Sequence, residues 1–298
     1  ADRVGKGIRG APRDALLADA APPAVRGRAF GLHRAADHLG AVLGPRGAFV
    51  MMERLGMPLR AIFLWAAVPG VLAVLAVVFG VRERRGAATA RSEARPDPLP
   101  RRPAPDARSG EARTPLGAPF WRYLAVLLLF TLGNATDAFL LLRASSLGVP
   151  TAAIPLLWAA LHVVKSSSSV AGGSLSDHLG RKPLIVAGWA LYALVYLLFA
   201  LATEAWHAWA LFLLYGAYFG LTEGVERALV ADLAPATRRG TAFGWYNLAI
   251  GLGALPASVI FGVVWDAVSP EAAFLLGAAL ALGAAVGLVA LVPARANA

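Results

Sequence analysis

The chain has 298 residues, of which 58% are hydrophobic and 15% charged, and its mean hydropathy is +0.61. Soluble domains average about 45–50% apolar and about 25% charged residues, so this composition excludes a soluble globular protein. The net charge of +10 does not indicate nucleic acid as a partner, because the arginines lie between apolar runs, where membrane proteins carry them. The absence of cysteine excludes disulfides, thiolate metal sites and cysteine nucleophiles.

A stretch near the start of the chain, residues 13–45, returns in diluted form later on. A shift of 213 positions, without a gap, places Ala15, Leu16, Ala18, Asp19, Pro22, Arg26, Gly27, Ala29, Phe30 and Gly31 on identical residues between Ala228 and Gly244. Further on, the segment 39–41 matches 252–254 at the same shift. A repeat at this spacing in an apolar chain indicates two related halves of one membrane protein.

The first half is expected to be incomplete in the printed sequence. By the repeat, the second half begins near Phe120, so its counterpart would begin about 93 residues before Ala1, room for roughly three spans of about 20 residues. We therefore expect residues 1–18 to form the end of a fourth helix. Two further helices are expected over 28–52 and 60–81, the latter with 21 consecutive uncharged residues.

Residues 82–119 have a different composition. They contain nine arginines, many Pro and Ala and almost no large apolar side chain, which predicts a disordered segment on the cytoplasmic side. The sequence thus divides into residues 1–81, the end of a first bundle; a linker over 82–119; and residues 120–298, a second bundle. A regulatory or lipid-binding role of the linker is the alternative to a plain connection.

Six apolar segments follow the linker, each long enough to span a bilayer: 120–142, 150–171, 183–203, 206–231, 240–265 and 272–293. With the linker inside, the connections on its side hold Arg181, Lys182, Arg238 and Arg239, and those on the other side hold Arg143, Glu204, Asp266 and Glu271. This charge bias predicts a multi-pass protein of a plasma membrane, with a cytoplasmic linker and C-terminus. The Arg- and Ala-rich composition favours a bacterial source.

The sequence GGSLSDHLGRK, residues 172–182, is predicted to join two spans by a tight charged turn. It resembles the signature loop of the major facilitator superfamily, G-x-L-x-D-x-x-G-R-K, with Gly173, Leu175, Asp177, Gly180, Arg181 and Lys182 in register. Arg3 and Gly7 resemble that family's fourth-helix R-x-x-x-G pattern, although Lys6 and Arg9 depart from it. The resemblance implies an all-α fold of two six-helix bundles, of which this chain holds roughly the last eight and a half of twelve helices.

A second motif, GAVLGP, resembles the G-x-x-x-G-P motif of proton-linked exporters in this family. Its residues Gly40, Gly44 and Pro45 would let helices approach closely and bend, and packing alone also explains the glycines. Arg46 departs from the family pattern, which has an apolar residue there.

The resemblance also implies a latch between the two halves. Asp177 would cap the positive start of the fifth helix near Arg26, and Arg181 would pair with Asp232. Gly173, Gly180 and Lys182 belong to the same loop. The alternative is that these charges only anchor the loop at the membrane surface.

Many ionisable residues lie within predicted spans. Because a charge in the membrane costs about 2.5–3.5 kcal/mol on insertion scales, such residues are expected to face a cavity or a partner. The residues assigned to a substrate and proton pathway are Arg9, Arg13, Asp14, Arg34, Asp37, Asn134, Asp137, Lys165, Glu223, Glu226 and Arg227. The shift of 213 places Arg13 on Glu226 and Asp14 on Arg227, which predicts charge pairs that close the cavity between the halves.

Proton coupling needs a group that titrates as access alternates. Asp137 is the first candidate, because it is expected in the body of an apolar span, and Asp37 and Glu223 follow. A permanent salt bridge of Asp137 to Lys165 or Arg34 is the alternative. Histidines 33, 38 and 162 do not form a metal-ligand motif, so neither a metal nor a cofactor is expected.

These features predict a monomeric secondary transporter that moves a small polar or ionic solute, a metal ion or its complex included, most simply by proton-coupled export. A polytopic membrane enzyme is one alternative, but the run Ser166 to Ser169 after Lys165 lacks a base at a recognisable spacing. A non-transporting sensor or an inactive fragment of a transporter is the other.

Overall fold

The computed structural model describes residues 2–80 and 115–293, and in these ranges it contains helices and no strand. The α-helices are α1 (Asp2–Ala20), α2 (Arg26–Glu53), α3 (Leu59–Gly80), α5 (Ala118–Gly133), α6 (Ala138–Ser146), α7 (Ile154–Leu179), α8 (Arg181–Leu201), α9 (Ala205–Leu233), α10 (Arg239–Ala267) and α11 (Pro270–Leu291). Short 3₁₀ turns lie at Pro23–Val25, Thr151–Ala153 and Ala236–Arg238. The predicted all-α class is confirmed.

The sequence repeat is reproduced in the backbone. Shifted by 213 positions, the end of α1, the 3₁₀ turn after it and the start of α2 fall on the end of α9, its 3₁₀ turn and the start of α10. Each turn follows a proline, Pro22 or Pro235, with the same φ of −54° and ψ of 145°. Proline ends a helix because it lacks the N–H and clashes with the preceding turn, so the repeated residue imposes the repeated corner.

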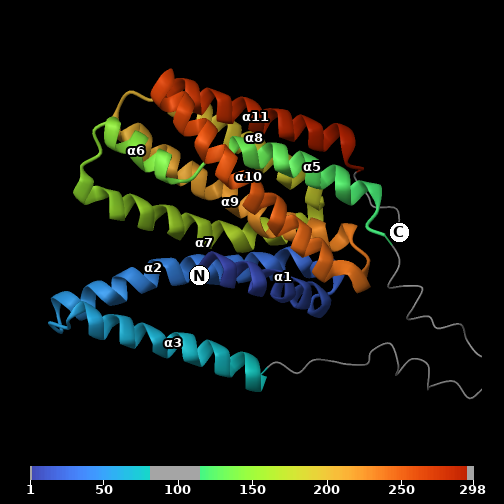
Figure 1. Cartoon of the computed structure of the whole chain (residues 1–298), viewed down its shortest axis with the longest axis horizontal. Coiled ribbons are helices and arrows are strands. Elements are labelled where there is room, and N and C mark those ends of the chain that lie inside the picture. The colour runs from blue at the N-terminus through green and yellow to red at the C-terminus, as the bar shows by residue number, and fades with distance from the viewer. Residues whose placement is uncertain (1, 81–114, 294–298) are drawn as a thin grey trace, which may run out of the picture. The chain divides into compact units, whose positions relative to one another are not determined.

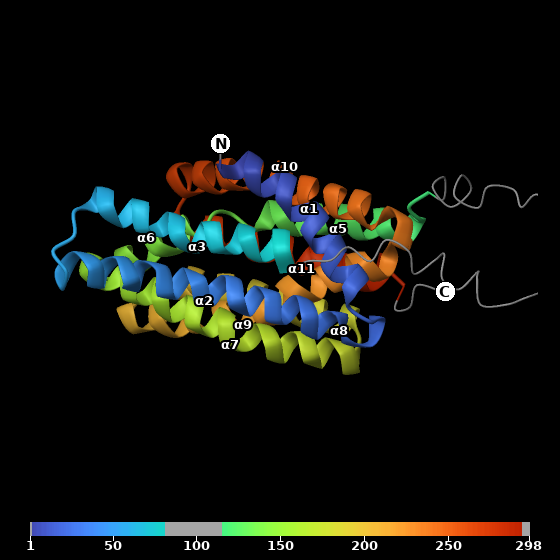
Figure 2. The ribbon, with the colours of Figure 1, turned by 90° about the horizontal axis from the view of Figure 1, so that it is seen from below.

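The chain forms two compact units, residues 1–42 with 111–298 and residues 43–110. In the larger unit, α7 packs against α9, α8 packs against both α9 and α11, and α5 packs against α10 and α11 (Figure 1). The start of the chain belongs to this unit, because α1 lies along α10 (Figure 2). The division into two six-helix halves stays a prediction, and residues 82–114 of the predicted linker lie outside the described residues.

Four segments of the described chain are long and apolar enough to cross a membrane: Ala118–Ser146, Arg181–Leu201, Ala236–Ala267 and Pro270–Leu291. They correspond to four of the six spans predicted after the linker. α7 and α9 are as long, with 26 and 29 residues, but they carry charged side chains and pack against each other. The contact between α7 and α9 gives their charged side chains a protein environment on the shared side.

The segment predicted as one helix over 120–142 is interrupted. α5 ends at Gly133 and α6 begins at Ala138, so Asn134 and Asp137 lie in the break and not on one helical face. The Tyr192 hydroxyl donates to the carbonyl of Gly133 at 3.0 Å and to Asn134 Oδ1 at 3.3 Å. A broken span is tolerated inside a bundle when neighbouring side chains satisfy the freed backbone groups.

The predicted charged loop is shorter than expected. α7 continues through Asp177 to Leu179, and only Gly180 separates it from α8. Gly180 has a φ of +94°, which a residue with a Cβ rarely adopts. The single-residue corner therefore requires glycine, and it fixes Asp177 in the last turn of α7.

Candidate transport site

One end of the bundle carries ion pairs between the corners of the repeated segments. We call this set the latch, and its residues are Asp19, Arg26, Asp177, Arg181, Asp232 and Arg239. Arg26 Nη1 lies 2.8 Å from Asp232 Oδ1. Arg239 pairs with Asp19. Because both residues of the first pair match those of the second at a shift of 213, the contacts are reciprocal, as across a two-fold axis.

Asp177 joins α7 to the start of α2. Its two carboxylate oxygens accept the backbone N–H groups of Gly27 and Arg28, each at 2.9 Å. The first N–H groups of a helix have no partner within it and carry the positive end of the helix dipole, so a carboxylate is bound strongly there. Arg181 holds this carboxylate from the other side and also donates to Asp232 Oδ2 at 3.2 Å.

Lys182 has a different place from the rest of its loop. Its Nζ donates to the main-chain carbonyls of Val289, at 3.0 Å, and Val292 at the end of α11. These carbonyls have no intrahelical partner and form the negative end of the helix dipole. Lys182 therefore links α8 to α11 and is not part of the latch.

The helices α2 and α7 cross in close contact beside Asp177. A Cβ added to Gly173 would collide with the carbonyl oxygen of Gly27, and one added to Gly31 would collide with that of Ser169. In contrast, a Cβ at Gly40 or Gly44 would meet no described atom within 4 Å. The side chain of Pro45 lies outside the described residues, so the packing role of GAVLGP stays a prediction.

A second group of charges, the central cluster, lies deeper between α1, α2 and α9. Its residues are Arg13, Asp14, Arg34, Asp37, His38, Glu223 and Arg227. Asp14 accepts from Arg13 Nη2 and from Arg227 Nε, each at 3.1 Å, and its side chain is only 2% exposed. The helix α1 is thereby tied to α9 through a buried carboxylate.

Glu223 is the second carboxylate of the central cluster. It receives Arg34 Nη1 at 3.3 Å and lies 2.9 Å from His38 Nε2. Arg227 Nη1 is 3.9 Å away. Arg34 also pairs with Asp37 on its own helix at 3.0 Å. The side chain of Arg9, assigned to the same pathway, lies outside the described residues.

Glu226 is held by neutral groups. Trp189 Nε1 donates to its Oε1 at 2.9 Å, and the Tyr246 hydroxyl lies 3.1 Å from its Oε2. The residue is 6% exposed, and no described cation lies within 4 Å of its carboxyl group. The sequence does not single out Trp189 and Tyr246, although a Trp in the middle of a span, away from the membrane interfaces, is a signal that could have indicated a polar partner.

Asp137 and Lys165 form a separate pair at the break in the α5–α6 span. Their charged atoms are 3.7 Å apart, and Tyr215 donates to Asp137 Oδ1 at 2.7 Å. Lys165 is 4% exposed, and its Nζ lies 3.4 Å from the centre of the Phe219 ring. Of the two partners that the sequence suggests for Asp137, the structure provides Lys165.

The serines after Lys165 make main-chain contacts. Ser166 Oγ donates to Ala35 O at 2.8 Å, and the hydroxyls of Ser167, Ser168 and Ser169 donate to carbonyls within α7. Among the described residues, no cluster of three His, Cys, Asp or Glu side chains is suited to a metal ion. The serine hydroxyls therefore satisfy main-chain carbonyls of α2 and α7 at the contact between these helices.

Two cavities adjoin the central cluster, and the second has the more polar lining. One, of about 230 Å³, is lined by Asn134, Glu223, Glu226 and Arg227 among others. The other, of about 340 Å³, is lined by Gly10, Arg13, Asp14, Arg34, Asp37, Arg227 and Asn247. Arg227 lies between them. A helical membrane protein that repeats its corner segments and has buried ion pairs between them has the organisation of a secondary transporter.

Comparison with known proteins agrees with this organisation. The Major Facilitator Superfamily model matches residues 3–222 and 139–297. An uncharacterized MFS-type transporter of Methanocaldococcus jannaschii is 33% identical over 287 residues, which cover 94% of this chain and 68% of that protein. An uncharacterized protein of Mycobacterium tuberculosis is 30% identical over 272 residues and is covered to 63% of its length.

Two further similarities concern characterised proteins. A tetracycline resistance protein, class B, of Escherichia coli is 32% identical over 108 residues, 36% of this chain. The solved structure of the proton:xylose symporter XylE, bound to 6-bromo-6-deoxy-D-glucose, superposes with a TM-score of 0.71 at 17% identity and covers 94% of this chain and 67% of that one. The chain belongs to the Major Facilitator Superfamily. It is a multi-pass membrane protein and a secondary transporter, and the reading as an enzyme is excluded.

Proposed function

We propose that this transporter exports a small polar or ionic solute in exchange for protons, by alternating access between two six-helix halves. The observation that carries the proposal is Glu226, a buried carboxyl group hydrogen-bonded by the neutral donors Trp189 and Tyr246. The other carboxylates of the site, Asp14, Asp37, Asp137 and Glu223, are each paired with a cationic or histidine side chain.

A carboxyl group in this setting can take up and release a proton without losing its contacts. An ionised Glu226 accepts from both neighbours, and a protonated one can donate to the Tyr246 hydroxyl, which acts as donor or acceptor. An unpaired buried charge is costly, whereas the neutral acid is not, so a proton can arrive without breaking an ion pair. Asp137 is the second candidate for the proton site, because it is 27% exposed on its side chain and its ion pair with Lys165 is long.

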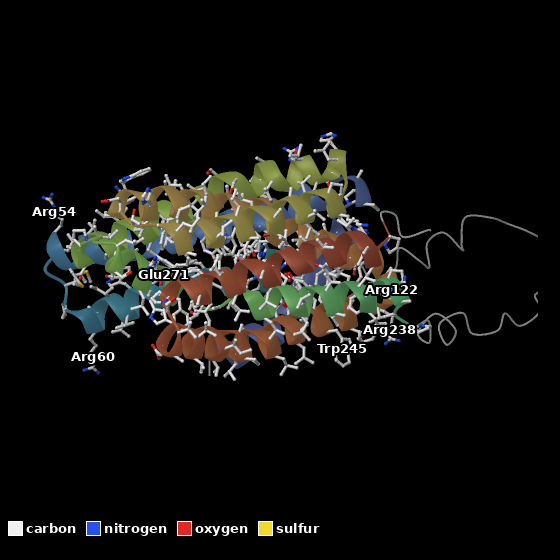
Figure 3. The ribbon with its side chains drawn as sticks, turned by 90° about the horizontal axis from the view of Figure 1, so that it is seen from above. Arg54, Arg60, Arg122, Arg238, Trp245 and Glu271 are labelled. Carbon is white, nitrogen blue, oxygen red and sulfur yellow. The ribbon has the colours of Figure 1, made fainter. Side chains whose placement is uncertain are left out.

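The proposed direction of transport is based on a sequence motif, and the proposed orientation in the membrane is based on the distribution of charged residues. The GAVLGP motif and the partial similarity to a tetracycline resistance protein favour export. Arg122 and Arg238 lie at one end of the bundle and Glu271 lies at the other (Figure 3). Arg143 pairs with Glu271 at that second end, but the end with Arg122 and Arg238 also carries the latch arginines Arg26, Arg181 and Arg239, so the positive-inside rule assigns it to the cytoplasm. The latch, which adjoins Arg238, then closes the cytoplasmic side, and the protein is a monomer of a bacterial inner membrane.

Everted membrane vesicles test this proposal. Respiration acidifies their lumen, and a pH-sensitive dye reports proton release when succinate, inorganic phosphate or tetracycline is added. The protein should release protons with at least one of these probes, Glu226→Gln should abolish the release, and Asp137→Asn should retain it. Proton release by Glu226→Gln at the unmodified rate would remove Glu226 as the proton site, and its loss in Asp137→Asn alone would assign the role to Asp137.

A further inference from the structure

The cavity between α1, α2, α9 and α10 contains an arginine whose guanidinium group is only partly used. Arg34 is 8% exposed, and its Nη1 atom forms ion pairs with the carboxylates of Asp37 and Glu223. Its Nε and Nη2 have no hydrogen-bond partner among the described residues. A buried donor without an acceptor is destabilising, and Arg34 lines a polar cavity in which a ligand could supply the missing acceptor.

The two free nitrogens form one edge of the guanidinium group. Their N–H bonds are nearly parallel, and this fork matches the two oxygens of a carboxylate or of a phosphate group. Asp14, the carboxylate beside this edge, does not fill it. Asp14 Oδ1 lies 4.0 Å from Arg34 Nη2, and it already accepts from Arg13, while the other oxygen accepts from Arg227.

The cavity has the size and charge that such a ligand needs. Its volume of about 340 Å³ is within the usual range of small-molecule sites. Its lining carries three guanidinium groups, of Arg13, Arg34 and Arg227, and two carboxylates. Asn247 of α10 adds a neutral amide to the lining. It lies opposite Gly10 of α1, since a Cβ added to Gly10 would be 3.7 Å from Asn247 Nδ2.

We propose that this cavity binds an oxyanion group of the transported solute, a carboxylate or a phosphate, through the Nε–Nη2 edge of Arg34. This inference rests on the proposed function only in calling the bound anion a substrate. Because Arg13 and Arg34 come from the first half and Arg227 and Asn247 from the second, an anion bound here contacts both halves. Binding of the anion therefore stabilises the conformation in which the two halves are in contact.

The test measures binding without transport. The protein in detergent is heated at constant pH and ionic strength with sodium succinate, sodium phosphate or sodium chloride, or with the neutral polyol erythritol, and unfolding is followed by tryptophan fluorescence. Succinate, phosphate or both should raise the unfolding temperature in a saturable way, with half-saturation at roughly 1–10 mM for so small a probe. Chloride and erythritol should not.

Variants assign the effect to the fork. Arg34→Gln should abolish the saturable shift, and Arg34→Lys, which keeps the charge but not the fork, should weaken binding at least about tenfold. Asp37→Asn removes a carboxylate that competes for the same guanidinium group, so it should bind as tightly or more tightly. Arg122→Gln, at an exposed arginine of α5, should bind like the unmodified protein.

Absence of a saturable shift with both anions, or equal binding by Arg34→Gln, would overturn the inference. If Arg34→Gln does not fold, the comparison between Arg34→Lys, which should bind more weakly, and Asp37→Asn, which should not, decides. Failure here is distinct from failure of the proposed function, because anion binding that responds to Arg34 without proton release contradicts only coupled export. Proton release that is indifferent to Arg34 contradicts only the anion site.

Discussion

Asp14 and Arg227, whose side chains are 3.1 Å apart, are separated by 213 positions, the period of the sequence repeat. Equivalent residues of two homologous halves can contact each other only near the axis that relates the halves. The reciprocal pairs Arg26–Asp232 and Arg239–Asp19 lie on either side of the same axis. The repeat therefore places opposite charges where the repeated segments meet, which is the arrangement that the proposed alternating access between two halves would use.

Asp177→Asn should destabilise the joined state of the latch. The change keeps the size of the side chain but replaces charge-assisted bonds to the start of α2 by neutral ones, a loss of about 1–2 kcal/mol. Spin labels at residues 25 and 237 would report a larger fraction of separated ends in distance measurements. Asp19→Asn is the control, because Asp19 is 53% exposed and its pair should contribute only about 0–1 kcal/mol. Equal effects of the two changes would contradict the capping role of Asp177.

Gly173→Ala should block the approach of α2 and α7. The new methyl group would collide with the backbone of Gly27, which cannot move as a flexible side chain could. We expect a transport rate below about a tenth of normal, with insertion into the membrane unchanged. Gly40→Ala is the matched control, since its methyl group meets no described atom within 4 Å. If Gly40→Ala also stops transport, the GAVLGP motif packs against residues outside the described ranges.

Lys165→Met should leave Asp137 without its cation. Removing one partner of a buried pair costs about 3–5 kcal/mol, and the exposure of Asp137 reduces this to about 2 kcal/mol of unfolding free energy. Thermal unfolding of Lys165→Met, Asp137→Asn and the double variant measures the coupling between them. Recovery of stability in the double variant would identify a structural salt bridge. Additive losses would contradict the pairing.

Trp189→Phe should change proton release modestly and retain it. The substitution removes one hydrogen bond to Glu226 Oε1 and leaves that of Tyr246, a loss of about 1–2 kcal/mol for a bond to an ionised acceptor. Since this bond favours the ionised carboxylate, its loss should shift the pH midpoint of proton release upward. A dye-based pH profile of everted vesicles gives the midpoint, and a downward shift would contradict the assignment.

Much of this architecture could be predicted from the sequence, because the features that define it are repeated or periodic. The prolines at the two corners and the arginine and aspartate beside each of them predicted the repeat, and apolar runs predicted the spans. The interruption of the α5–α6 span could not be predicted, since it depends on Tyr192, which is distant in sequence and satisfies the freed carbonyl. Likewise, local spacing does not show that Gly180 alone forms the corner.

The sequence predicted which residues form the candidate site better than it predicted which of them pair with each other. Intramembrane charges indicated which helices carry the central cluster. Of the two pairs that the shift of 213 matched, Asp14 and Arg227 are in contact, whereas Arg13 bonds Asp14 and not Glu226. The sequence favoured Asp137 as the titrating group, because it was expected in the body of an apolar span, with a salt bridge to Lys165 or Arg34 as the alternative. In the structure Asp137 pairs with Lys165. Among the described carboxyl groups assigned to the pathway, Glu226 is the one without a cation within 4 Å, and its hydrogen-bond partners Trp189 and Tyr246 come from α8 and α10. Three-dimensional neighbours of this kind leave no spacing signal.

The central claim is that the two halves join and separate at the latch during each transport cycle, and one cross-linking measurement tests it most directly. The chain has no cysteine, so Asp19→Cys with Arg239→Cys introduces a single reactive pair, which a short bifunctional thiol reagent can join reversibly. We expect transport to stop when the pair is linked and to return when the link is reduced, with either single cysteine variant unaffected by the reagent. Transport that continues at its full rate with the pair linked would contradict the account.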